Sequence, residues 1–353
     1  MTKILVIAAG LIVLIVVLSS CSRNLRPTAG TSKKNGGNNP GNNNSTTHTK
    51  SSANTGDFTG TVLKNVIYTN AVTFQGSSQD LSLDIYKPAN ATGKKFPAIF
   101  LFHGGSFVGG DKNGLASTCS KLANNGYVAI SVNYRLGWGF VSKSATTCDD
   151  STRFKQAIYR SVQDAHSAMR YIATHADEYN IDKNWIFIGG QSAGAVTALI
   201  TAYLQQQDAG SFFPGLDTTL GLLDKSANTP NADFTLKGII SMWGAFVDPN
   251  LITGKTALPT IFFQGALDKA VPFNSGTFVP CSGASPVYGT YPLYNRLKDL
   301  GQTAIAHVDP QGGHGVFEED FRIQNILCFL SNVQQGTKKQ VYLTGVQNSC
   351  DKQ

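Results

Sequence analysis

One short motif constrains this fold more than any other feature of the chain. The sequence GQSAG, residues 190–194, lies between an apolar run at 185–189, which predicts a buried strand, and a helical pattern that opens at Ala193. Such an abrupt passage from strand to helix holds Ser192 in a strained backbone conformation with its hydroxyl exposed. The flanking glycines let neighbouring chain pass closely. The motif therefore predicts a nucleophilic serine at the end of a strand.

A second motif supplies the complementary group. The pattern glycine-x-serine-x-glycine is common in glycine-rich sequences, so its context decides its meaning. Upstream of it, HGGSF at residues 103–107 follows an apolar run at 97–102. We expect the backbone N–H groups of Gly104, Gly105 and Ala193 to form an oxyanion hole, which stabilises the charge on a carbonyl oxygen during acyl transfer. An ordinary glycine-rich turn is the alternative for HGGSF alone.

Short apolar runs alternate with helical patterns from about residue 60 onward. This order predicts an α/β fold, with a mostly parallel sheet of eight or more strands and helices on both faces, preceded by an antiparallel meander. The expected strands lie near 62–68, 71–76, 80–86, 97–102, 127–133, 185–189, 237–242, 259–264 and 304–308. The expected helices lie near 112–125, 153–178, 193–207, 289–300 and 317–332. Residues 208–236 lack clear periodicity and are expected to form a small lid beside the substrate site.

The motifs HGGSF and GQSAG, with NYRL at residues 133–136, resemble those of the α/β-hydrolase carboxylesterases. The resemblance extends to the hormone-sensitive-lipase-like and the bacterial feruloyl and acetyl-xylan esterase families, and covers about residues 60–333. It implies the α/β-hydrolase fold, with an acid after the seventh core strand and a histidine after the eighth. Asp268, which follows the run 259–264, and His314, in GGHG, match these two positions.

The resemblance assigns a role to each of three residues. It implies Ser192 as nucleophile, His314 as general base and Asp268 as the acid that orients the histidine. Asp248 follows the preceding strand, a position that some relatives use, and is the rival acid. The pattern G-x-x-D-x-x-V-P favours Asp268. His103 is expected to brace the oxyanion loop.

The substrate is less constrained than the chemistry. Ser106 stands where many relatives have a third glycine, and Gln191 stands where many have an acid, which leaves the acyl preference open. Aromatic residues either line an acyl or aryl pocket or pack in the core: Phe107, Trp138, Phe140, Phe212, Phe213 and Trp243. We expect a small-molecule or polymer-linked ester as substrate, with short-chain acyl, feruloyl or polyester-type esters first. No cofactor is expected.

Two other functions stay open. A serine peptidase or amidase of the same fold would use the same residues, although such peptidases usually carry a propeller or a large cap for which this chain has no room. A catalytically inactive surface binding protein could keep the fold without the activity, since fold alone does not establish function.

The N-terminus predicts export. In residues 1–21, Lys3 precedes about fifteen apolar residues, fewer than the roughly twenty of a membrane-spanning helix. LSSC at 18–21 resembles the bacterial lipobox, in which the cysteine, here Cys21, is acylated. An uncleaved anchor is the alternative. Residues 22–56, rich in Asn, Gly, Ser and Thr, predict a flexible linker. We expect a protein that is lipid-anchored at the bacterial cell envelope, at the outer membrane on its periplasmic or surface side.

The rest of the chain is expected to form one catalytic domain, residues 57–335, followed by a C-terminal tail at 336–353. The net charge is +7, but residues 1–56 hold six basic residues and no acidic one. The body is therefore nearly neutral, which argues against a nucleic-acid partner.

Cysteine usage fits an oxidising compartment. With Cys21 assigned to lipid, five cysteines remain: Cys119, Cys148, Cys281, Cys328 and Cys350. We expect one bridge between Cys119 and Cys148 and a second between two of the three C-terminal cysteines, although the sequence does not fix the connectivity. No metal site is expected, because no pair has C-x-x-C spacing.

Overall fold

The computed structural model describes residues 56–138, 151–224, 228, 232–278 and 285–351, within the unit that spans residues 51–353. Its strands are β1 Thr61–Val72, β2 Ser78–Lys87, β3 Phe96–Phe102, β4 Val128–Val132, β5 Ile181–Gln191, β6 Leu236–Met242, β7 Thr260–Gly265, β8 Ser275–Gly276, β9 Val287–Tyr288, β10 Ala304–Asp309 and β11 Gln340–Thr344. Its helices are η1 Lys112–Leu115, α1 Ala116–Asn124, α2 Ser151–Thr174, α3 Ala193–Tyr203, α4 Gln206–Phe212, α5 Leu216–Leu220, η3 Pro249–Leu251, α6 Thr290–Asp299, α7 Glu319–Gln334 and η4 Ser349–Asp351. The expected signal peptide, Cys21, Phe140, Cys148 and Cys281 lie outside the described residues.

A nine-stranded sheet forms the centre, in the order β1-β2-β4-β3-β5-β6-β7-β10-β11. β2 pairs antiparallel with β1 and with β4, and every other pair in this sheet is parallel. The mostly parallel α/β fold predicted from the alternating patterns is confirmed.

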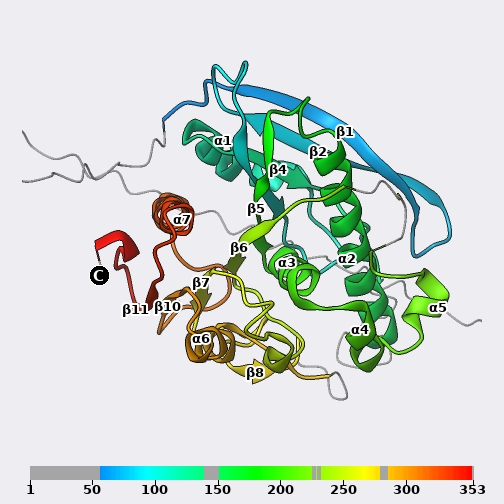
Figure 1. Cartoon of the computed structure of the whole chain (residues 1–353). Helices are drawn as coiled ribbons and strands as arrows, with labels where there is room; N and C mark the ends of the chain where they lie inside the picture. Colours follow the sequence, from blue (N-terminus) through cyan, green and yellow to red (C-terminus); the bar gives the residue numbers. More distant parts are fainter. Residues whose placement is uncertain (1–55, 139–150, 225–227, 229–231, 279–284, 352–353) are drawn as a thin grey trace, which may run out of the picture. The chain divides into compact units, whose positions relative to one another are not determined.

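Neighbouring residues of each central strand enter two different cores. On β3, Ala98, Phe100 and Phe102 pack into one core, whereas Ile99 and Leu101 pack into the other. Side chains alternate along a strand, so a sheet that is buried on both faces needs continuous apolar runs. Helices α2, α3 and α6 cover the first core, and α1 and α7 cover the second (Figure 1).

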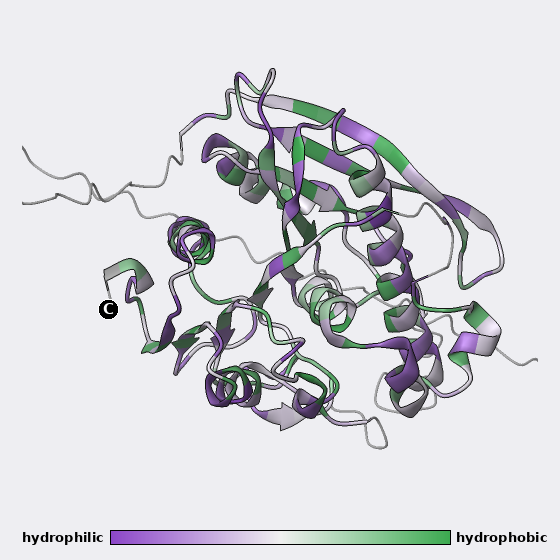
Figure 2. Cartoon of the chain, viewed as in Figure 1, coloured by the Kyte–Doolittle hydropathy of each residue, from purple (hydrophilic) through white to green (hydrophobic). Residues whose placement is uncertain are grey.

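The helices differ in how much of their surface is apolar. Almost all of α3 is buried, and Figure 2 shows it as mainly hydrophobic, whereas α2 carries hydrophilic residues as well. This fits the position of α3 between the sheet and α2, where no face meets water. In the described part of the chain, no helix combines the length and the apolar character that a membrane span requires.

The structure corrects two strand assignments. The two strands expected at 62–68 and 71–76 are one strand, β1, because Thr69 and Asn70 continue the pairing with β2 and an irregularity next to Ile67 bends the strand without ending it. Residues 336–353, expected as a tail, contribute β11, which pairs in parallel with β10 and extends the sheet.

The described part of the segment expected as a lid, 208–236, includes most of α4 and all of α5, and the end of α5 packs against α2. Tyr159 of α2 donates a hydrogen bond to the carbonyl of Gly221 at 2.8 Å, and the amide of Gln163 donates to the carbonyl of Leu220 at 2.8 Å. Polar side chains of α2 thus satisfy the carbonyls at the end of α5. The insertion is small, as expected, and it is docked on α2.

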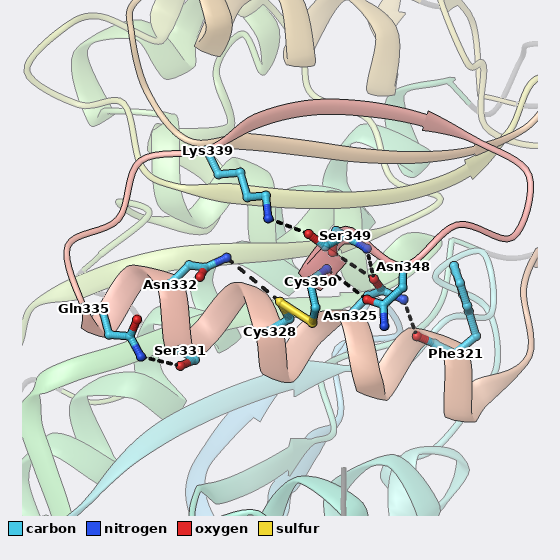
Figure 3. Close-up of a disulfide and its surroundings, with 10 residues drawn as sticks. All are labelled: Phe321, Asn325, Cys328, Ser331, Asn332, Gln335, Lys339, Asn348, Ser349 and Cys350. Carbon is cyan, nitrogen blue, oxygen red and sulfur yellow. Dashed lines mark hydrogen bonds between the residues drawn. A yellow bond between two sulfur atoms is a disulfide. The ribbon is translucent and has the colours of Figure 1, made fainter. Parts of the chain in front are cut away.

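The cysteines pair differently from the first expectation. Cys328 of α7 and Cys350 of η4 form a disulfide, which confirms a bridge between two of the C-terminal cysteines (Figure 3). Asn325 accepts hydrogen bonds from the N–H and the hydroxyl of Ser349 beside it. Cys119 is a free thiol, so the expected bridge to Cys148 is wrong. The helical phase of α1 turns Cys119 into the core with Leu122.

Candidate active site

The functional residues predicted from the sequence gather where parallel strands end. Residues 103–107 follow β3, Ser192 follows β5, Asp268 follows β7 and His314 follows β10. Because these strands are parallel and belong to one sheet, their carboxyl ends share one edge, which is where α/β folds bind ligands.

Ser192 occupies the strained turn that the motif predicts. Its φ is 53° and its ψ is −120°, and its N–H donates to the carbonyl of Met242 at 2.9 Å. A Cβ at Gly194 would lie 2.0 Å from the carbonyl oxygen of Phe102, and one at Gly190 would lie 2.5 Å from the same oxygen. The close approach that requires both glycines is confirmed.

The side chains of Ser192, His314 and Asp268 form a hydrogen-bonded chain. Nε2 of His314 lies 2.8 Å from Oγ of Ser192, and Nδ1 lies 2.8 Å from Oδ2 of Asp268. A carboxylate only accepts hydrogen bonds, so this arrangement calls for the proton on Nδ1 and leaves Nε2 free to accept from the serine hydroxyl. Asp248 has another partner, since its Oδ1 accepts from the N–H of Asn250 at 2.9 Å and caps η3.

Asp268 is held in its ionised form. Its Oδ1 accepts from the N–H groups of Ala270 at 2.9 Å and Val271 at 3.0 Å. Burial acts to raise the pKa of Asp268, but the hydrogen bonds from His314 and from these N–H groups outweigh burial, and the pKa lies below its ordinary value. A carboxylate is therefore present to orient the imidazole across the neutral pH range.

The loop after β3 is strained beside the serine. Gly105, Ser106 and Phe107 have φ values of 120°, 54° and 61° in succession. A Cβ on Gly104 would lie 3.3 Å from the Cβ of Ser192, which shows how closely the loop approaches.

The expected oxyanion donors are free to bind a ligand. In the part of the chain that the structure describes, no hydrogen bond occupies the N–H groups of Gly104, Gly105 and Ala193. Ala193 opens α3, so its N–H belongs to a helix N-terminus, where the backbone attracts negative charge.

His103 braces this loop, as expected. Its ring stacks on Tyr134 at 4.5 Å between centroids, and its Nδ1 lies 2.7 Å from the carbonyl of Gly104. The hydroxyl of Tyr134 donates to the carbonyl of His103 at 2.7 Å. Burial is the largest influence on the pKa of His103 and lowers it, so the ring stays neutral. His103 is therefore a support of the loop.

Aromatic rings form a cluster beside the same loop. The indole N–H of Trp138 donates to the carbonyl of Ser106 at 2.9 Å, and Phe154 packs on Phe107, Trp138 and Phe278 at 5.7, 5.0 and 5.7 Å. Phe154 and Phe278 were not predicted, because they come from distant segments that meet only in the fold. Neither residue lies in a sequence motif that would have marked it as part of the site.

The other aromatic candidates divide between core and site. Phe213 is buried against Tyr159, and Phe212 packs on the same core. Trp243, which follows β6, has its ring centroid 6.1 Å from that of His314. Trp243 therefore lies at the site, while the two phenylalanines stabilise the fold.

Comparison with known proteins gives the same architecture. Esterase 2 of Thermogutta terrifontis, solved after phosphorylation by paraoxon, aligns with 80% of this chain and 96% of its own, with a TM-score of 0.54 and 20% identity. The chain has the α/β-hydrolase fold. Within it, residues 83–247 match the family BD-FAE. That match contains the loop at residues 103–107 and Ser192 and ends before Asp268 and His314.

Curated relatives of this chain match over shorter segments. The cAMP-regulated D2 protein of Dictyostelium discoideum is 29% identical over 164 residues, which cover 45% of this chain and 29% of the relative. Esterase LipI of Mycobacterium tuberculosis is 26% identical over 181 residues, 48% of this chain and 52% of the relative. The matched segment thus spans about half of these relatives or less.

Among the described residues, no three His, Cys, Asp or Glu side chains form a cluster that could hold a metal ion. Two titratable groups meet at the sheet edge, His314 and Asp268. His314 is hydrogen-bonded to Asp268 through Nδ1 and to Ser192 through Nε2.

Proposed function

We propose that this chain is a serine carboxylic-ester hydrolase with Ser192 as nucleophile, His314 as general base and Asp268 as the orienting acid. The observation that carries the proposal is the pair of 2.8 Å hydrogen bonds that His314 makes to the other two residues. A serine hydroxyl is a weak nucleophile unless a positioned base removes its proton as it attacks.

The reaction would run in two steps. Nε2 of His314 takes the hydroxyl proton while Oγ of Ser192 bonds to the ester carbonyl, and the resulting imidazolium returns the proton to the departing alcohol. Water, deprotonated by the same imidazole, then attacks the acyl-enzyme, and the imidazolium returns the proton to Oγ of Ser192 as the acid is released. Asp268 stabilises the imidazolium in both steps.

The negative oxygen of each tetrahedral intermediate needs donors that are already in position. The free N–H groups of Gly104, Gly105 and Ala193 support an oxyanion hole at this point. Their loop is fixed by His103, Tyr134 and Trp138, so little reorganisation is needed when charge develops.

Short-chain acyl, feruloyl or polyester-type esters are the substrates we propose first. The aromatic cluster of Phe107, Trp138, Phe154 and Phe278 supports a compact apolar acyl or aryl group beside the oxyanion loop. In the described part of the lid region, the helices are the short α4 and α5. Because no large lid is present there to cover a long acyl chain, we expect long-chain triglycerides to be poor substrates.

The alternatives differ in a measurable way. A peptidase or amidase would cleave an anilide of the same acyl group, and an inactive binding protein would cleave neither ester nor anilide. The relative LipI is named an esterase, and together with the match to BD-FAE this favours an ester over an amide as the substrate.

The test is hydrolysis of p-nitrophenyl esters from acetate to palmitate by the full chain, next to Ser192→Ala. We expect turnover of short esters that falls by several orders of magnitude in the variant. Equal turnover in the two proteins would remove Ser192 from the mechanism, and cleavage of p-nitroanilides alone would favour the amidase.

We further propose that the protein is exported and lipid-anchored through Cys21, with residues 22–56 as a tether. The basis is the sequence of residues 1–21, with its short apolar run and its LSSC ending. Such an anchor would hold the catalytic domain at the cell envelope, where polymer-linked esters are accessible.

A further inference from the structure

Trp243 has an unusual backbone for a large aromatic residue. Its φ is 46°, a left-handed conformation that is strained for a bulky side chain. Two contacts hold the backbone there. The N–H of Trp243 donates to the carbonyl of Phe263 at 2.6 Å. Gly244, the next residue, packs so closely on Ala195 that a Cβ on Gly244 would lie 2.6 Å from the Cβ of Ala195. The fold therefore fixes the backbone from which this indole projects.

The indole points its ring at the catalytic histidine. The two ring centroids are 6.1 Å apart with an interplanar angle of 67°, and Trp243 is buried. The imidazole of His314 is itself 31% exposed, and it sits in a loop rich in glycine, so backbone rigidity alone does not hold it. An edge contact from a rigid indole limits rotation of the imidazole away from its two hydrogen bonds.

Arg322, in the first turn of α7, contacts Trp243 and the segment that follows His314. Its guanidinium lies over the Trp243 ring, 5.1 Å from the centroid. The same side chain donates hydrogen bonds to the carbonyls of Val316 and Phe317, which come shortly after His314 in the chain. One planar cation therefore ties the indole to the loop that carries the imidazole.

We propose that Trp243, held by Arg322, is a positioning residue that keeps the imidazole of His314 in its two hydrogen bonds. Neither side chain reacts; both reduce the fraction of time in which the imidazole is turned away from the serine. The proposal rests on the proposed esterase function for its kinetic test, while a spectroscopic test stands without turnover.

The kinetic test is Trp243→Ala in the full chain. We expect kcat for a short p-nitrophenyl ester to fall about 10- to 100-fold with KM within about twofold, because misplaced catalytic groups affect the reaction more than ground-state binding. Trp243→Phe, which keeps an aromatic edge, should recover most of kcat. Unchanged kcat in Trp243→Ala, or an equal rise in KM instead, would overturn the proposal.

Trp185 offers a matched control. Trp185 also has a cation over its ring, Lys237 at 5.1 Å from the centroid. It lies within β5, seven residues before Ser192, which follows the end of that strand. Trp185→Ala removes a tryptophan–cation pair of the same kind, and we expect kcat to stay within about twofold of the parent. A loss equal to that of Trp243→Ala would indicate a general effect on stability.

The spectroscopic test is the downfield proton resonance of the hydrogen bond between Nδ1 of His314 and Asp268, identified by its absence in Asp268→Asn. We expect faster exchange of this proton with water in Trp243→Ala and parental exchange in Trp185→Ala. This readout separates the two proposals, since a chain without esterase activity still shows it. Parental exchange in the Trp243 variant would contradict the positioning role.

Arg322 provides a second route if Trp243→Ala fails to fold. Arg322→Met keeps much of the apolar stem and removes the cation and the hydrogen bonds. We expect kcat to fall by about three- to tenfold, with the same faster exchange of the Nδ1 proton. Parental values of kcat and of proton exchange in Arg322→Met would show that Arg322 does not hold the indole.

Discussion

Asp268 and Asp248 both follow parallel strands of one sheet, yet their carboxylates accept from different partners. Asp268 accepts from His314 and from two backbone N–H groups, whereas Asp248 caps the helix that it precedes. At the scale of a residue, the hydrogen-bond partners therefore identify Asp268 as the candidate orienting acid and Asp248 as a capping residue.

Replacing Asp268 tests that distinction. In Asp268→Asn an amide replaces the carboxylate, so the imidazole loses its charged acceptor and its preferred tautomer, and we expect kcat/KM to fall by about three to four orders of magnitude. Asp248→Asn is the matched control and should stay within about twofold. The reverse result, measured with a short p-nitrophenyl ester, would make Asp248 the acid.

His307 carries a prediction about pH. It is fully buried on β10, stacked 5.0 Å from Phe263, and neither ring nitrogen has a partner among the described residues. Burial lowers the pKa of His307 from 6.5 to about 4. Between these values the unfolded chain binds the proton and the folded chain does not, so stability is lost as pH falls from about 6.5 to about 4, by roughly 3 kcal/mol.

Denaturant unfolding at a series of pH values checks this account. His307→Leu removes the titration and should show a shallower loss of unfolding free energy over the same interval. The difference between the two proteins isolates His307 from the carboxylates and from His166, whose pKa burial also lowers. Parallel curves would show that His307 is not the source.

At the scale of elements, α7 joins the site to the end of the sheet. It follows the His314 loop, and after it the chain forms β11, which extends the sheet beside β10. The disulfide between Cys328 and Cys350 closes a loop around β11, with a sequence separation of 22. Because β11 is an edge strand, paired on one side only, this closure is expected to carry much of its stability.

Removing the bridge tests its role. In Cys328→Ser with Cys350→Ser, we expect the free energy of unfolding to fall by roughly 3 kcal/mol, the order given by loop closure of this length. Amide hydrogens of residues 340–344 should exchange faster, while those of β5 keep parental rates. Faster exchange throughout the sheet, with no preference for β11, would contradict a local role.

The elements that sequence patterns predicted best are those that local chemistry determines. Ser192 and His314 lie in glycine-flanked turns, each following an apolar strand, and both signals are contained in a few neighbouring residues. β11 was missed because an edge strand of five residues alternates too briefly to stand out. The pairing of Cys119 was wrong because the direction in which α1 turns that thiol depends on tertiary packing.

At the scale of the whole molecule, the N-terminal segment is expected to set where the catalytic domain is held. The anchor at Cys21 is a prediction from residues 1–21, whose short apolar run ends in LSSC.

Lipid labelling of Cys21 tests this prediction. Expressed in a bacterial host with labelled palmitate, the full chain should carry the label and sediment with membranes, whereas Cys21→Ala should be unlabelled. Cys119→Ala serves as a control for other thiols and should stay labelled. Equal labelling of the Cys21 variant would rule out acylation at this cysteine.

The most direct test of the central claim is a search for an acyl group on Ser192 during turnover. The full chain is mixed with a p-nitrophenyl ester, quenched in acid within the first turnovers, digested and analysed by mass spectrometry. The account predicts one added acyl group on the peptide that contains residues 190–194, absent from Ser192→Ala. Hydrolysis without an adduct on this peptide, or an adduct at another residue that persists in Ser192→Ala, would contradict it.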